Sequence, residues 1–503
     1  MKTKNSILNF ITELIPLIIL MFLGLFKTKF LITEMAPNST GLYQLFSQLL
    51  GYVTIFEFGM TSALLYRFFD PVSKKNKKRI SVLFYSGKKV FNIIALIMVG
   101  FGIVFSFVIP FLIKDNPFSY WYILLTFLMY ISTNIIHYLI VSHKTLLEAE
   151  QKKHITNIIS QSFDIIKSLL EIIVLLVFKD LVILLTVGII TSIVSSLLIV
   201  KSCKKYNPDL VDSKERDYEM LSDVKNLFVH KIAYLVNNNV DLIIVTKGLG
   251  LGSVVIYSTY NFIVNMLKRI TSRVYVSMVP SLGNLIVEDK KQAQKVFFEI
   301  NNLMFFMAIL LSSSLFVSIN PFIKIWYEGE VITSYSLALG FSLIFFINIV
   351  IQPLLAFTDA GGCFKETKKS AVLEAIINLT LSLILFKVLG IFGILLATFI
   401  GYLISDNIVR AKIICNNLLN TSTRKYYCDL IFYKVVMIIL LIIEYFIFRN
   451  IEINSIFNWL LISGVNFTGV LIILLLLFKI TNKLNFLERI KRILLKMKDK
   501  VIK

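Results

Sequence analysis

The sequence has few charged residues for its length. Asp, Glu, Lys and Arg make up 17% of its 503 residues, whereas a soluble domain is about one quarter charged. Apolar residues make up 57% of the chain and the mean hydropathy is +0.79. Apolar runs of about 20 residues recur from end to end, which leaves no segment from which to build a large soluble core. The composition therefore predicts an integral membrane protein.

The sequence also lacks the common signatures of enzymes and metal sites. Its four cysteines form no CxxC pair, so neither a metal nor a disulfide framework is indicated. No P-loop is present, and no histidine has metal-ligand spacing or a nucleophile beside it. A membrane enzyme should have a long outer loop or an intramembrane histidine paired with a carboxylate, and neither is found. We expect no enzyme activity, no metal and no cofactor.

What the chain does contain is a series of about fourteen apolar segments long enough to cross a membrane. The first of them is too long for the h-region of a signal peptide and has no small-residue cleavage site, so it is predicted to remain as a span. The predicted spans are residues 9–32, 39–66, 90–113, 119–142, 155–178, 180–200, 225–247, 252–279, 297–320, 331–357, 368–387, 390–411, 430–449 and 455–478.

The net charge of +21 is distributed unevenly between the two sets of loops. Most Lys and Arg residues fall at the N-terminus, in the even-to-odd loops and in the C-terminal tail, including the clusters at 74–79 and 201–216. Positively charged loops stay in the cytoplasm, so both termini are predicted to be cytoplasmic. The basic residues then serve topology and attraction to anionic lipid headgroups, and nucleic acid is not an expected partner.

The two halves of the chain repeat short patterns at an offset of about 212 residues. Pro110-Phe111-Leu112-Ile113-Lys114 matches Pro321-Phe322-Ile323-Lys324, and Gly41-Leu42-Tyr43 matches Val255-Ile256-Tyr257. An offset of six spans gives both copies the same orientation, and such parallel repeats place a substrate site between the halves and allow alternating access. The predicted parts are an N-terminal lobe (1–200, spans 1–6), a cytoplasmic linker (201–224), a C-terminal lobe (225–411, spans 7–12), two further spans (412–482) and an amphipathic cytoplasmic tail (483–503).

Polar side chains inside the seventh and eighth spans are the main candidates for a binding site. Asn261, Asn265, Arg269 and Arg273 recur every four residues on the eighth span. The seventh span adds Lys231, Asn238 and Asp241. Ionisable groups in a span are expensive unless paired or hydrated, and guanidinium groups bind phosphate oxygens well. These residues predict a cationic cavity for a phosphate or pyrophosphate. The alternative is that Lys231 snorkels to the interface and the arginines pair with Asp241.

Acidic residues in the first half of the chain offer a second role. Glu13 and Glu57 lie in spans one and two, the counterparts of spans seven and eight. A buried carboxylate there is a candidate to carry a coupling H⁺ or Na⁺. The alternative is that such a carboxylate is a structural partner of Arg67, Arg269 or Arg273.

Five further acidic residues receive a structural interpretation. Asp164, Lys167 and Glu171 in span five can neutralise one another along one helix face. Asp359, Glu374 and Asp406 are interpreted as isolated, solvated acids near the cytoplasmic ends of their spans.

Several short motifs resemble bacterial polysaccharide flippases of the multidrug/oligosaccharidyl-lipid/polysaccharide exporter superfamily. Matching segments occur at residues 57–63, 230–244, 257–258, 280–284, 320–326, 359–362 and 374–378, in order and over nearly the whole chain. The resemblance implies an all-α integral membrane fold of about fourteen helices, with two pseudo-symmetric six-helix lobes around a central cavity and two C-terminal helices. The sequence departs from the family in the first span, where Glu13 stands instead of the cation that these flippases often carry.

The resemblance also implies a function. It is transfer of an undecaprenyl-pyrophosphate-linked oligosaccharide repeat unit across the plasma (inner) membrane, for O-antigen, capsule or a similar surface polysaccharide. Expected partners are this lipid-linked oligosaccharide, membrane lipids, and the polysaccharide polymerase and glycosyltransferases of the same pathway. The alternative is a cation-coupled exporter of small molecules with the same fold.

Overall fold

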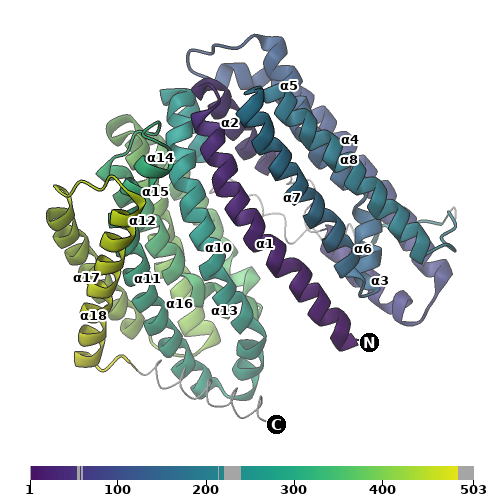
Figure 1. The fold of residues 1–503 in the computed structure, drawn as a ribbon. Helices are drawn as coiled ribbons and strands as arrows, with labels where there is room; N and C mark the ends of the chain where they lie inside the picture. The colour runs from purple at the N-terminus through teal and green to yellow at the C-terminus, as the bar shows by residue number, and fades with distance from the viewer. Residues whose placement is uncertain (1, 54–56, 58–59, 213–214, 220–239, 485–503) are drawn as a thin grey trace. The chain divides into compact units, whose positions relative to one another are not determined.

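The computed structural model describes residues 2–53, 57, 60–212, 215–219 and 240–484, and within these ranges all regular secondary structure is helical (Figure 1). This confirms the all-helical fold class. The side chains of residues 2–15 are not among those described. The chain divides into two compact units, Met1–Val255 and Ile256–Lys503, and each is described here by itself. The predicted lobes, linker and final pair of spans remain a prediction.

The first unit contains eight named helices and a helical stretch over residues 240–249. They are α1 (Lys2–Thr33), α2 (Pro37–Val53), α3 (Met60–Ser73), α4 (Lys77–Leu112), α5 (Tyr120–Leu139), α6 (Val141–Ala149), α7 (Lys153–Val177) and α8 (Leu181–Tyr206). Helix α1 packs along α7 (Figure 1), and α4 packs on α5. The apolar core lies around α3, α4 and α6.

Most of the second unit follows α10 (Leu251–Glu288), which starts just before the boundary between the units. The remaining helices are α11 (Lys290–Trp326), α12 (Tyr335–Val350), α13 (Gln352–Gly361), α14 (Phe364–Leu389), α15 (Ile391–Tyr402), the π-helix η3 (Leu403–Arg410), α16 (Ala411–Ile413), the π-helix η4 (Ile414–Leu418), α17 (Arg424–Phe448) and α18 (Ile456–Ile480). Helix α11 packs against α12, α17 and α18.

Nine helices in the described part of the chain are long and apolar enough to cross a membrane. This is the pattern of a multi-pass membrane protein. Helices α4 and α11 contain 36 and 37 residues, which at about 1.5 Å per residue is roughly 55 Å and well beyond a hydrocarbon core of about 30 Å. Each therefore extends past the membrane core, which the predicted spans 90–113 and 297–320 did not include.

The helix order of the first unit recurs in the second. A long helix with a proline near its end (α4, α11) is followed by a span (α5, α12), a short helix (α6, α13) and a packed pair (α7 with α8, α14 with α15). Two predicted spans each cover parts of two named helices. Residues 39–66 divide between α2 and α3, and residues 331–357 divide between α12 and α13, where Pro353 follows Gln352 and cannot donate a backbone hydrogen bond.

Local sequence explains several helix starts and one close contact. Asn76, Ser119 and Asp180 each accept a backbone N–H of the following turn, which is how such side chains cap helices. Gly41 lets α2 approach the start of α10, because a Cβ at this position would lie 2.5 Å from the carbonyl oxygen of Leu251. The backbone contact thus requires glycine.

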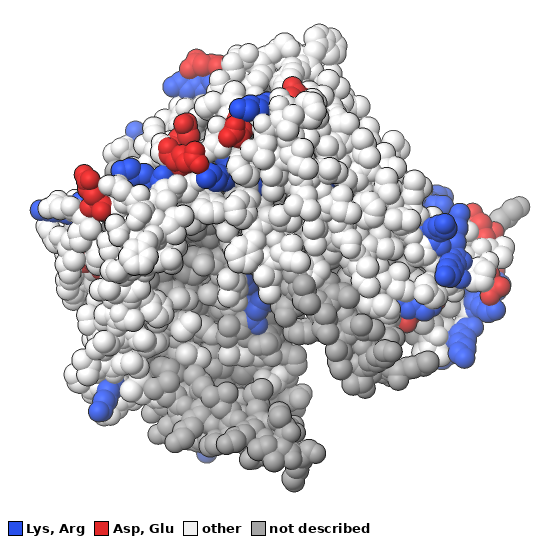
Figure 2. Space-filling model, in the orientation of Figure 1, with Lys and Arg blue, Asp and Glu red and all other residues white. Residues whose placement is uncertain are grey.

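An acidic segment after α8 lies on the basic turn between α3 and α4. We call residues 209–219 the acidic strap; residues 213–214 within it are not described. The Asp209 carboxylate is 2.7 Å from Lys77 Nζ, and Glu215 is 3.1 Å from Lys78 Nζ. Figure 2 shows Lys and Arg mixed with Asp and Glu in this region, beside uncharged helix sides.

Further contacts fasten the same strap. Asp217 pairs with Arg79, and its backbone N–H donates to Ser86 Oγ at 2.8 Å. Arg67 pairs with Glu219 at 2.8 Å and with Asp217 at 3.8 Å. The predicted basic cluster after span two is therefore partly neutralised by its own chain.

Candidate functional site

The predicted anion-binding residues of the second unit lie on α10. They are Asn261, Asn265, Arg269 and Arg273, and we call them the α10 stripe. Asn265 Nδ2 donates to Asn261 Oδ1 at 3.0 Å, so the two amides form a continuous polar strip on α10. One and two turns further, Arg269 and Arg273 are exposed. No ion pair with either arginine occurs among the described residues of the second unit. A guanidinium in a membrane-protein helix faces water or an anion in preference to lipid.

The predicted site residues of the seventh span are only partly described by the structure. Asp241 is 4% exposed and lies near Tyr52 of α2 in the first unit. Lys231 and Asn238 lie outside the described residues, and so does the side chain of Glu13. The predicted site residues therefore divide between the two units, and within the second unit Asn261 and Asn265 are in direct contact.

Glu57 is held by hydroxyl groups. Thr61 Oγ1 donates to Glu57 Oε1 at 2.5 Å, and Tyr138 of α5 donates its hydroxyl to Glu57 Oε2 at 3.1 Å. The suggested partner Arg67 instead pairs with Asp217 and Glu219 of the acidic strap. A half-buried carboxylate with two neutral donors is chemically suited to bind a cation or a proton.

The first unit contains a charge network that sequence analysis had not assembled. Lys27 of α1 lies 2.7 Å from Glu171 of α7, and Lys27 Nζ also donates to the Tyr43 hydroxyl at 2.9 Å. Lys167, one turn before Glu171, is 4.0 Å from its other carboxylate oxygen. The Glu171 side chain is 4% exposed. We call this group the α1–α7 network.

The α1–α7 network has more positive than negative charge. Lys144 and Asp164 lie beside it, so that three lysines face two carboxylates and one positive charge is left over. The expectation that the first span lacks a cation is wrong, because Lys27 belongs to α1. The signal was present in the sequence: Lys27 falls inside the predicted span 9–32, but Glu171, which holds it, is far away in the chain.

The second unit contains an acidic counterpart around η3, which we call the η3 cluster. Asp406 and Arg410 form an ion pair within η3, and they are 2% and 8% exposed. Glu374 of α14 is buried and lies close enough for its charge to interact with both. The interpretation of Glu374 and Asp406 as solvated acids is therefore wrong, whereas Asp359 is exposed as expected.

The local backbone explains why the η3 cluster is buried. A π-helix shifts the register of its side chains and occurs often at functional sites. In η3 the shifted register presents Ser405 to α14, where its carbonyl oxygen accepts from Ser370 Oγ at 2.6 Å. It also presents Asn407 to α17, where the amide oxygen accepts from the Tyr426 hydroxyl at 2.8 Å. The η3 cluster therefore places two carboxylates and one guanidinium together in a buried position.

His143 of α6 is a buried base outside the predicted spans. It is 7% exposed, and its ring meets the Phe84 ring edge to face at 4.9 Å. Burial, followed by the positive charges of Lys88 and Lys204, lowers the pKa of His143 to about 4. The residue therefore stays neutral in the folded protein at ordinary pH.

No protein-family profile matches the sequence, and no curated protein matches it. The structure is similar to several solved transporters, three of which are described here. A lipid II flippase MurJ in an inward closed conformation has a TM-score of 0.65 at 17% identity, with 95% of this chain and 98% of that chain covered. An inward-facing multidrug resistance MATE transporter of the MOP superfamily has a TM-score of 0.57 at 12% identity, covering 84% and 95%.

The third is the eukaryotic MATE transporter AtDTX14, with a TM-score of 0.52 at 11% identity, covering 85% of this chain and 98% of that chain. These similarities extend over most of each chain. Helix content, helix order and these neighbours agree, and the chain therefore has the fold shared by MurJ and the MATE transporters.

Proposed function

We propose that this protein is a flippase of the superfamily to which the matching transporters belong. It moves an anionic, undecaprenyl-pyrophosphate-linked oligosaccharide repeat unit across the plasma (inner) membrane by alternating access, for surface polysaccharide biosynthesis. Both termini are cytoplasmic in this proposal. The polymerase and glycosyltransferases of the same pathway are its functional partners, and H⁺ or Na⁺ is its coupling ion.

The α10 stripe is the observation that carries this proposal. Arg269 and Arg273 are exposed on a helix of a transporter fold, with no carboxylate paired to them among the described residues of their unit. A diphosphate supplies several oxygens for bidentate guanidinium contacts. The Asn261–Asn265 strip continues the same face with neutral donors and acceptors, which suits the adjoining sugar. The excess positive charge of the α1–α7 network also favours an anion.

A reconstituted system tests the proposal directly. Vesicles that contain the protein and a fluorescent undecaprenyl-pyrophosphate oligosaccharide should transfer the lipid between leaflets, measured by protection from an impermeant quencher. Arg269→Ala and Arg273→Ala should each lower the rate about tenfold or more, which corresponds to loss of one charge-assisted contact. Arg269→Lys should retain part of the parent transfer rate. The neighbouring Ile270→Ala should transfer the lipid at the same rate as the parent protein.

An experiment in cells provides a second test of the proposed function. Deletion of the gene, or Arg269→Ala, should leave lipid-linked repeat units facing the cytoplasm. Normal surface glycan in both strains would refute the proposed function.

A cation-coupled exporter of small molecules is the second candidate. The hydroxyl-held Glu57 favours it, since a carboxylate inside a membrane protein is a candidate site for a coupling cation. Drug accumulation assays separate the two functions. An exporter should lower accumulation of cationic dyes and leave lipid-linked oligosaccharide unmoved.

A further inference from the structure

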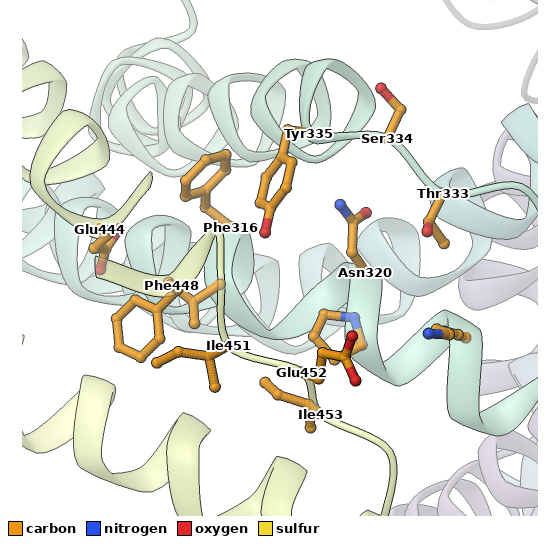
Figure 3. Close-up of a pocket in the computed structure, with 13 residues that line it drawn as sticks. Phe316, Asn320, Thr333, Ser334, Tyr335, Glu444, Phe448, Ile451, Glu452 and Ile453 are labelled. Carbon is orange, nitrogen blue, oxygen red and sulfur yellow. The ribbon is translucent and has the colours of Figure 1, made fainter. Parts of the chain in front are cut away.

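A cavity of about 210 Å³ opens where α11, α12, α17 and the α17–α18 connection meet (Figure 3). Its walls combine the aromatic rings of Phe316, Tyr335 and Phe448 with the polar side chains of Asn320 and Glu452. It includes Asn320, Pro321 and Lys324 of the motif at 320–326, to which the proposed function gives no role. We call it the α11–α17 pocket.

The pocket lies at one defined end of its helices. Residues 320–324 are at the end of α11, Tyr335 is at the start of α12, and Glu444 is close to the end of α17. Trp326 and Trp459 lie at this same end, and the Trp459 ring contacts the Phe322 ring at 5.1 Å. Tryptophans gather at the headgroup level of membranes, so water can reach the mouth of the pocket.

Glu444 borders the pocket and is 3% exposed. Its Oε1 accepts from Asn466 Nδ2 of α18 at 3.0 Å. Ser313 of α11 lies close to the same carboxylate, but neither Glu444 Oε2 nor the Ser313 hydroxyl makes a hydrogen bond of normal geometry. A buried carboxylate with one unsatisfied oxygen is costly in a membrane helix unless it binds a positive charge.

The surrounding charges do not supply that positive charge. Lys324 of α11 and Glu452 of the α17–α18 connection share the pocket with the phenol of Tyr335 of α12. On α18 the facing side chain is the neutral Asn466, and on α17 Arg449 stacks over the rings of Tyr445 and Phe446. Among the described residues, none of these cations forms an ion pair with Glu444.

We propose that Glu444 is a proton-binding site that the α11–α17 pocket connects to water. A hydronium ion in the pocket gives its proton to Oε2, which forms an O–H bond and leaves a water molecule. Oε1 keeps the Asn466 hydrogen bond, and the Ser313 oxygen accepts from the new O–H. Na⁺ fits less well, because Glu444 and Ser313 offer too few oxygens and Asn466 turns its amide N–H₂ toward the carboxylate.

The test is infrared difference spectroscopy on the purified full chain. A pH step should give the carbonyl band of a protonated carboxylic acid, and D₂O should shift it. Glu444→Gln should remove the band, whereas Glu452→Gln, in the same pocket but exposed, should keep it. Ser313→Ala keeps the acid and should shift the band, so the proposal is testable even if Glu444→Gln does not fold.

Access is tested by Thr333→Trp, which fills the pocket and should slow the D₂O shift of the band at least tenfold. A band that persists in Glu444→Gln, or that does not respond to pH, overturns the proposal. A band that responds to Na⁺ at fixed pH assigns the site to sodium and also overturns it.

The link to transport rests on the proposed function and is measured separately. Flipping of the lipid-linked oligosaccharide should respond to an imposed pH gradient in the parent and lose that response in Glu444→Gln. If the infrared band behaves as expected but no flipping occurs, the proton site stands and the proposed function fails. If flipping occurs with the same pH response in Glu444→Gln, Glu444 does not couple transport.

Discussion

The α1–α7 network and the η3 cluster differ in charge composition, although each involves a helix at the same place in the repeated helix order, α7 in the first unit and α14 in the second. In the first unit three lysines face two carboxylates beside α7. In the second unit two carboxylates of α14 and η3 face one arginine. The same helix order therefore supports two different electrostatic environments. One suits an anion, and the other suits a proton or cation.

The two groups also differ in whether their ion pairs join separate helices. The network of the first unit joins α1 to α7, so it fixes two neighbouring helices, whereas the Asp406–Arg410 pair lies within one π-helix. Breaking the first should loosen packing between helices. Breaking the second should leave unpaired charge in a closed core. Four substitutions test this distinction.

Arg410→Leu should have the largest effect on stability. It removes the guanidinium that pairs with the buried Asp406 and interacts with Glu374, which should lower the free energy of unfolding by about 3–5 kcal/mol. The double variant Arg410→Leu/Asp406→Asn should recover much of this loss. The exposed Lys412→Ala is the matched control. Unfolding midpoints in detergent give the measurement, and an unchanged midpoint in Arg410→Leu would contradict the buried η3 cluster.

Lys27→Met should have the next largest effect. Glu171 then keeps only Lys167, at 4.0 Å, and we expect a loss of about 2–4 kcal/mol because most of the pairing of a buried carboxylate is removed. Glu171→Gln in the same chain should restore stability, since it removes the uncompensated charge. If the double variant is less stable than Lys27→Met alone, the network does not hold α1 on α7.

Acid should destabilise the first unit through His143. The pKa of His143 is about 4 in the folded protein, below its ordinary value of 6.5, so the unfolded chain binds the proton more readily. The stability that neutral His143 provides is complete above pH 6.5 and is lost as the pH falls toward 4, by up to about 3 kcal/mol. His143→Phe keeps the ring contact and should flatten this dependence. All four histidines of the chain precede residue 256, so we expect this loss of stability in acid to arise in the first unit. If the His143→Phe variant loses as much stability in acid as the parent, His143 is not its cause.

Tyr138→Phe should have the smallest effect. It removes one of the two hydroxyl donors to Glu57 and keeps the ring, with an expected loss of about 1 kcal/mol. Thr61→Val removes the other donor and should have a similar effect. If both variants together cost more than about 3 kcal/mol, Glu57 is more strongly desolvated than its two hydrogen bonds indicate.

The sequence predicted the helices well because apolar runs and helical spacing are local. It placed Arg269 and Arg273 on one face, and it identified Asn261 and Asn265 as their neighbours. It missed Lys27 and misread Glu374 because their environment depends on partners far away in the chain. Burial of an acid cannot be inferred from its distance to a predicted span end, since Asp406 and Asp359 lie in similar sequence contexts but have different exposure.

The ion pairs of the acidic strap were also not predicted from the sequence, because the partners are far apart in the chain. Residues 201–224 were predicted as a linker with a basic cluster, and their acids received no role. Arg67, Lys77 and Arg79 draw those acids onto the α3–α4 turn. Such pairs are exposed and individually weak, so pattern alone gave no reason to expect them.

The strap has a consequence for the order of events during synthesis. Lys78 and Glu215 are separated by 137 residues, and a ribosome adding roughly 5–20 residues per second needs about 7–30 s to cover that distance. During this interval Lys77 and Lys78 lack the strap acids Asp209 and Glu215, with which they pair in the folded chain. The positive charge of these two lysines is thus present early and is partly neutralised later by the chain itself.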